Sequence, residues 1–162
     1  MIAVVMGVTG SGKTTVGAAL ARRLGVPFAD ADDFHSPANV AKMSAAVPLD
    51  DADREPWLRA IGEWLAAHAG TGGVASCSAL RRAYRDILRE HAPDVFFVHL
   101  HGDRETVRGR VAGRPGHFMP SSLVESQFAA LEPLGEDEHG VVLALDAPAD
   151  DLVAAAARSI VD

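Results

Sequence analysis

The segment that most constrains the fold is G-V-T-G-S-G-K-T at residues 7–14, which directly follows an apolar run at residues 2–6. It matches the phosphate-binding pattern G-x-x-x-x-G-K-[ST] in full. Its glycines let successive backbone N–H groups point inward, and a helix beginning near Lys13 adds the positive end of its dipole. The alternative is a glycine-rich turn without a ligand. Because the motif lies between a strand pattern and a helix pattern, it favours nucleoside triphosphate binding.

The rest of the chain alternates between strand and helix patterns. Beyond the first strand, we predict strands at residues 26–29, 74–78, 95–101 and 141–146. Helices are predicted between them, with Ser36-Pro37 and Asp103 as N-terminal caps. This alternation predicts an α/β fold with a parallel sheet, and a length of 162 residues predicts a single domain over residues 1–162.

Composition excludes several classes of protein. The formal net charge of −7 argues against a dedicated nucleic-acid binder, whose contact surface would be basic. The single cysteine, Cys77, cannot form an internal disulfide, which favours a reducing compartment. No apolar stretch approaches the ~18 residues of a membrane span. We therefore expect a cytoplasmic protein without nucleic-acid or membrane partners.

An acidic cluster, F-A-D-A-D-D-F-H at residues 28–35, follows the second predicted strand. The carboxyl ends of parallel strands form the edge at which such folds bind ligands. Asp30 and Asp32 would project to the same side if the extended geometry continues. One could then hold Mg²⁺ through water while the other faces an acceptor hydroxyl. The alternative is a capped loop with solvated carboxylates.

Five segments together resemble the gluconate kinase family of small P-loop kinases: G-V-T-G-S-G-K-T-T, D-A-D-D-F-H-S-P-A-N-V-A-K-M, P-L-D-D-A-D-R-E-P-W-L, C-S-A-L-R-R-A-Y-R-D-I-L-R and G-H-F-M-P-S-S-L-V-E-S-Q-F-A-A-L-E-P. The resemblance implies ATP-dependent phosphorylation of D-gluconate at its 6-hydroxyl, and commonly a homodimer. It also implies a three-layer P-loop fold, in which helices flank a five-stranded parallel sheet. A substrate-binding helical segment is expected at about residues 33–69 and a mobile lid at about residues 112–128.

The resemblance implies roles for individual residues. Asp32 would orient and deprotonate the acceptor hydroxyl, and Lys13 and Arg114 complete the predicted catalytic set. Thr14 would ligate Mg²⁺, while Asp30 would hold it through water, as in the D-x-D motif of shikimate kinases. The predicted nucleotide-binding residues are Gly7, Thr9, Gly10, Ser11, Gly12, Lys13, Thr14, Thr15 and Arg110.

A second group of residues matches family positions around the sugar acid. Lys42 and Arg54 can pair with a carboxylate, while His35 and Asn39 can form hydrogen bonds with hydroxyl groups. The alternatives are that Arg54 pairs only with Asp51 or Asp53 and that His35 is only a helix cap. The predicted substrate-binding residues are Asp32, His35, Asn39, Lys42, Arg54, Ser78 and His117.

The predicted lid has an arginine near its start. Arg110 precedes the loop-like stretch G-R-P-G-H-F-M-P at residues 113–120, and Arg114 lies at its start, before Gly116-His117-Phe118. In this fold, lid arginines close onto the transferring phosphoryl group and help to exclude water. The alternative is a solvated loop with incidental arginines.

Other functions stay open at this point. A related kinase would act on shikimate or another sugar acid, and a regulatory switch would hydrolyse the nucleotide to change a partner. The chain has no N-K-x-D guanine motif, and the acidic cluster would have no role in such a switch. The chain also departs from the family pattern, with Arg81 where lysine is usual and Ala46 where glycine is frequent.

Overall fold

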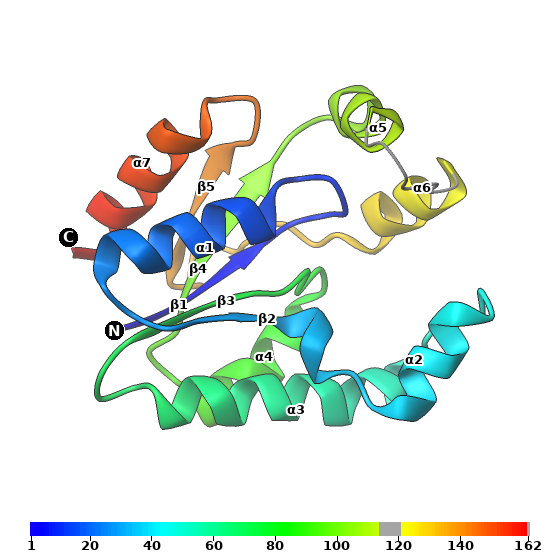
Figure 1. The fold of residues 1–162 in the computed structure, drawn as a ribbon, viewed down its shortest axis with the longest axis horizontal. Helices are drawn as coiled ribbons and strands as arrows, with labels where there is room; N and C mark the ends of the chain where they lie inside the picture. The colour runs from blue at the N-terminus through cyan, green and yellow to red at the C-terminus, as the bar shows by residue number, and fades with distance from the viewer. Residues whose placement is uncertain (114–120, 162) are drawn as a thin grey trace.

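The computed structural model describes residues 1–113 and 121–161, and five parallel strands form its single sheet in the order β2-β3-β1-β4-β5 (Figure 1). Every neighbouring pair is parallel. The strands are β1 (Ile2–Met6), β2 (Phe28–Asp30), β3 (Gly73–Ser76), β4 (Phe96–His101) and β5 (Gly140–Ala144). The predicted five-stranded parallel sheet is confirmed.

Helices cover both faces of this sheet and complete three layers (Figure 1). Helices α1 and α7 pack on one face, while α3 and α4 pack on the other. In chain order the helices are α1 (Lys13–Leu24), the short 3₁₀ helix η1 (Ala31–Phe34), α2 (Pro37–Ser44), α3 (Asp51–Ala67), α4 (Arg82–His91), α5 (Arg104–Ala112), α6 (Ser121–Ala130) and α7 (Ala149–Val161). Within the described ranges, none of them has the length and apolarity that crossing a bilayer requires.

The central strand β1 fixes the position of the glycine loop that follows it. All five of its side chains are buried. Ala3 and Val5 join the core under α1 and α7, while Ile2, Val4 and Met6 join the core under α3 and α4. A strand buried on both faces reads as an unbroken apolar run, which is why the sequence pattern located it.

Two strands end earlier than predicted. β3 stops at Ser76 and β5 at Ala144, each two residues before the expected end. In both cases one more ladder bond forms, from Cys77 N–H to Val5 O and from Leu145 N–H to His101 O. Turns follow at once, because Ala79 adopts a φ of 44° after β3 and Ala147 N–H bonds back to Ala144 O after β5.

Helix α2 ends in a Schellman motif with alanine at the position that usually holds glycine. Val47 N–H donates to Lys42 O at 2.8 Å, and Ala46 N–H donates to Met43 O at 3.1 Å. This pair of bonds places Ala46 in the left-handed region, with a φ of 59°. The left-handed conformation costs a residue with a Cβ about 1–2 kcal/mol. Ala46 therefore carries local strain within the predicted substrate-binding segment.

We predict that Ala46→Gly raises the free energy of unfolding by about 0.5–1 kcal/mol, because relief of the strain exceeds the extra chain entropy of glycine. Urea denaturation measures the change. Ala41→Gly, inside the same helix, is the matched control and should lower stability by about 1 kcal/mol. A loss of stability in both variants would contradict the strain at residue 46.

Candidate active site

The glycine loop passes too close to its neighbours for side chains at two positions. Gly7 has a φ of 152°, and a Cβ there would lie 2.8 Å from the Leu100 carbonyl oxygen. Gly10 has a φ of 77°, and a Cβ there would lie 2.7 Å from Val111 Cγ2. The loop therefore packs its backbone directly against β4 and α5, and glycine is required for both conformation and space.

The end of this loop provides donors for an anion. Helix α1 begins at Lys13, and its N-cap, Gly12, makes no side-chain capping bond. The first-turn N–H groups of a helix lack intrahelical partners and carry the positive end of the dipole, which suits phosphate oxygens. Lys13 lies across the loop, with its Nζ donating to Val8 O at 3.1 Å.

Asp30 links the acidic cluster to the glycine loop. One carboxylate oxygen accepts a hydrogen bond from Thr14 Oγ1 at 3.3 Å. The other caps η1 by accepting from Asp32 N–H at 2.9 Å. Because η1 begins at Ala31, the extended geometry assumed for residues 30–32 is wrong. The 3₁₀ turn, rather than strand alternation, sets the direction of Asp32.

The carboxyl group of Asp32 is perturbed by this environment. Partial burial is the largest cause, followed by the charge of Asp30, and together they raise the pKa of Asp32 above its ordinary value. The positive charges of Lys13 and His35 act in the opposite direction. A carboxylate with a raised pKa near a loop lysine has the character of a general base beside a phosphate site.

Aromatic and amide side chains support the next part of the segment. The His35 ring stacks on Trp57 with 4.4 Å between centroids, and Trp57 Nε1–H donates to Ala31 O at 2.7 Å. Asn39 is buried, and its Nδ2 donates to Asp53 O at 3.0 Å and lies 3.4 Å from His35 Nδ1. Partial burial lowers the pKa of His35, so its neutral form is favoured.

The two predicted carboxylate-binding cations already have partners. Lys42 Nζ lies 2.7 Å from Asp53 Oδ2, and this bond raises the pKa of Lys42. Arg54 Nη1 lies 3.8 Å from Asp51 Oδ1 and 3.5 Å from the Tyr84 hydroxyl. Of the two aspartates considered, Arg54 contacts Asp51 rather than Asp53. Both cations stay solvent-accessible, with side-chain exposures of 40% for Lys42 and 33% for Arg54.

A cavity of about 490 Å³ lies between the glycine loop, α5 and the turn after β5. Arg110 lines it, and its Nη2 donates to Leu145 O at 2.6 Å, which ties α5 to the turn after β5. The loop side of the cavity is formed by Gly10, Ser11, Gly12 and Thr15. Its size and its position at the phosphate loop suit the remainder of a nucleotide.

Comparison with known proteins identifies the family. The family model for shikimate kinase matches residues 9–122. A gluconokinase from Gluconobacter oxydans is 51% identical over 137 residues, covering 83% of this chain and 77% of that protein. The chain belongs to the gluconokinase family. A probable gluconokinase from Rattus norvegicus is 41% identical over 98% of this chain and 97% of its own. The crystal structure of a gluconokinase from Sinorhizobium meliloti superposes with a TM-score of 0.90 at 46% identity, covering 98% of this chain and 90% of that one.

Membership of the gluconokinase family confirms the resemblance read from the motifs, and with it a nucleotide-dependent small-molecule kinase. The structure gathers Lys13, Thr14, Asp30 and Asp32 at the carboxyl edge of the sheet through the contacts described above. Ser78 also lies there, and its carbonyl oxygen accepts from Gly7 N–H at 3.3 Å. The roles of these residues stay predictions, and Arg114 and His117 lie outside the described residues.

Sequence reasoning missed two residues of this site. Gln127, on α6, accepts a hydrogen bond from Thr9 N–H through its Oε1 at 2.5 Å. Tyr84, on α4, donates its hydroxyl to Asp51 at 2.7 Å, and its ring lies beneath Arg54. Both contacts join distant parts of the chain, so no local spacing could have indicated them.

The raised pKa of Asp32 has a consequence for stability. The folded chain binds this proton more tightly than the unfolded chain, so the ionised carboxylate opposes folding above its folded pKa. We predict that Asp32→Asn raises the thermal midpoint at neutral pH. The gain should shrink on acidification and vanish below the ordinary aspartate pKa of 3.8. Calorimetry across this pH range measures it.

The matched control is Asp33→Asn, which removes a carboxylate from the same turn. A midpoint for Asp32→Asn that lies below the wild-type value at neutral pH would contradict the assignment, since the carboxylate would then contribute to folding.

Proposed function

We propose that this chain transfers the γ-phosphoryl group of ATP to the 6-hydroxyl of D-gluconate, giving 6-phospho-D-gluconate and ADP. The observation that carries the proposal is the placement of Asp32 beside the glycine loop, in the turn that Asp30 caps while its other carboxylate oxygen accepts from Thr14. Phosphoryl transfer is catalysed mainly by positioning and charge stabilisation, and this arrangement brings a base and a phosphate cradle together.

The phosphate side of the proposed site uses the loop and the start of α1. The loop N–H groups and Lys13 would bind the β- and γ-phosphates, and Arg110 would face the nucleotide from α5. The hydroxyl of Thr14 and the carboxylate of Asp30 supply oxygen donors 3.3 Å apart, which fits Mg²⁺ held directly by Thr14 and through water by Asp30. Mg²⁺ would neutralise charge that develops on the phosphates.

The acceptor side uses η1 and the segment after it. Asp32 would accept the proton of the 6-hydroxyl as its oxygen attacks phosphorus. Asn39 and the neutral form of His35 would form hydrogen bonds with other hydroxyls of the sugar acid. Lys42 and Arg54 would bind the carboxylate of the sugar acid. Each cation would then lie between that carboxylate and the aspartate that it now contacts.

Further predictions of the resemblance belong to this proposal. Ser78 lies at the sheet edge and would contact the substrate, as would His117, and Arg114 would act on the transferred group. We also propose a homodimer in the cytoplasm, which sedimentation velocity and cell fractionation address. A kinase for shikimate is the second candidate, because the family model for that activity matches residues 9–122.

The acceptor is tested with a coupled ADP-release assay over sugar acids, shikimate and water, each with Mg·ATP. We expect D-gluconate to give the highest kcat/KM, and phosphorus NMR to place the phosphate on the 6-oxygen. Preference for shikimate would favour the second candidate. ADP release that does not depend on any acceptor would instead indicate a nucleotide hydrolase.

The base is tested with Asp32→Asn, which keeps the side-chain volume but cannot accept the proton. We expect kcat to fall by about 10²-fold or more, the scale of losing a general base, while the Kd for ATP changes little. Asp33→Asn should keep both values near wild type. Turnover close to wild type in Asp32→Asn would remove this residue from the mechanism.

A further inference from the structure

The glycine loop is held from two sides by segments that lie far from it in the sequence. On one side, Gly7 N–H donates to Ser78 O at 3.3 Å, in the corner between β3 and α4. On the other side, Thr9 N–H donates to Gln127 Oε1 on α6 at 2.5 Å. The geometry of the loop therefore depends on where this corner and α6 are placed.

These two supports are tied to each other just beyond the loop. α6 ends at Ala130, and the chain continues into the connection that leads to β5. Glu132 N–H donates to Leu80 O at 2.7 Å, and Glu132 Oε1 accepts from Arg82 N–H at 3.0 Å. The corner after β3 and the connection after α6 thus form one hydrogen-bonded frame.

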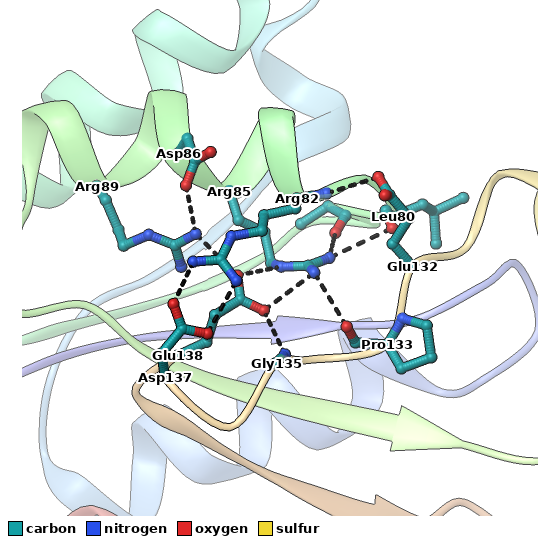
Figure 2. A network of polar contacts seen from close by, with 11 residues as sticks. Leu80, Arg82, Arg85, Asp86, Arg89, Glu132, Pro133, Gly135, Asp137 and Glu138 are labelled. Atoms are coloured by element: carbon teal, nitrogen blue, oxygen red, sulfur yellow. Dashed lines mark hydrogen bonds and ion pairs between the residues drawn. The ribbon is translucent and has the colours of Figure 1, made fainter.

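A buried arginine lies at the centre of this frame (Figure 2). The side chain of Arg85, on α4, is 0% exposed. Its Nη1 donates to Ala79 O at 2.9 Å and to Leu80 O at 3.3 Å, and its Nη2 donates to Pro133 O at 3.4 Å. The guanidinium group therefore bridges the backbones of both supporting segments.

Glu138 holds this guanidinium in place. Its carboxylate accepts from Arg85 Nε at 2.9 Å and from Arg85 Nη2 at 3.1 Å, and it also accepts from Arg89 and from Gly135 N–H. Burial acts to raise the pKa of Glu138, but the bonds from Arg85, Gly135 and Arg89 outweigh it and lower that pKa to about 2. The carboxylate thus stays charged opposite Arg85.

The energetics of this pair indicate a positional role. Replacing a buried ion pair by apolar groups of similar volume is often neutral or stabilising. A contribution to stability therefore does not by itself explain why Arg85 and Glu138 are paired here. Here the arginine bonds the carbonyl of Ala79, whose φ of 44° is strained for a residue with a Cβ. Strained backbone persists where surrounding contacts over-determine it, and such strain concentrates at functional sites.

We propose that Arg85, locked by Glu138, is a positioning residue for phosphoryl transfer, which sets the glycine loop through Ser78 and Gln127. The inference rests on the proposed kinase activity, because the loop that it positions is the one that would bind the phosphates. Arg85 itself touches neither substrate in this scheme. It acts by fixing the carbonyl groups of residues 79, 80 and 133.

The main test is the double variant Arg85→Met/Glu138→Leu, which removes both buried charges at similar volume. We expect it to fold, with a kcat at least about tenfold below wild type and a raised Kd for ATP. Hydrogen exchange should accelerate at the Gly7 and Thr9 amides and stay unchanged in β1. A folded double variant with wild-type kcat, Kd and exchange would overturn the proposal.

The matched control is Asp137→Asn, because Asp137 pairs with Arg82 between the same two segments but on the surface. This exposed pair should contribute little to stability, and its loss should leave kcat, the Kd for ATP and hydrogen exchange in the loop at wild-type values. If Asp137→Asn reproduced the kinetic loss, general loosening of the segments rather than the buried arginine would be responsible, and the proposal would fail.

Gln127→Met keeps the proposal testable if the double variant does not fold. It removes the acceptor for Thr9 N–H from a half-buried position and leaves Arg85 and Glu138 in place. We expect faster exchange at Thr9 alone, a raised Kd for ATP and a lower kcat, whereas wild-type values would contradict the α6 support. If the wild-type enzyme phosphorylates no sugar acid, the proposed function fails. The Kd for ATP and hydrogen exchange at the loop amides would still test the positioning role of Arg85.

Discussion

The rest of the structure depends on the close approach of the glycine loop to the strand beside it. Gly7 brings its backbone so near to Leu100 O that a methyl group would not fit. This contact orients the chain between β1 and α1, so that Lys13 and Thr14 follow at the carboxyl edge of the sheet. The burial of β1 on both faces makes the platform rigid, because interiors at crystal-like packing density do not yield to small shifts.

The segment that follows β2 holds acidic and basic side chains close together, and some of these charges stay accessible to solvent. Asp30 uses both carboxylate oxygens in local contacts. Burial, followed by the charge of Asp30, raises the pKa of Asp32. Lys42 and Arg54 are paired with aspartates but reach solvent, which leaves each cation accessible to the ligand carboxylate of the proposed function. This separation of fixed and accessible charges suits the anionic substrate that we propose.

The sequence predicted those parts of the molecule whose causes are local. The loop motif, the apolar run of β1 and the Ser36 cap of α2 each depend on a few consecutive residues, and the structure has them as expected. The extended geometry expected for residues 30–32 was wrong because the cap made by Asp30 replaces extended chain with a 3₁₀ turn. The contacts from Gln127 to Thr9 and from Glu138 to Arg85 join remote segments, and no periodicity reports such pairs.

The strand order has a consequence for how the protein is made. Thr14 and Asp30 are near in sequence, yet β1 and β2 do not pair with each other, because β3 lies between them. On a ribosome, the first two strands must wait until residues 73–76 have emerged and inserted as the middle strand. Such non-local pairing is slow, so the emerging chain gains affinity for nucleotide late. Bound nucleotide would then favour only those chains that have completed this insertion.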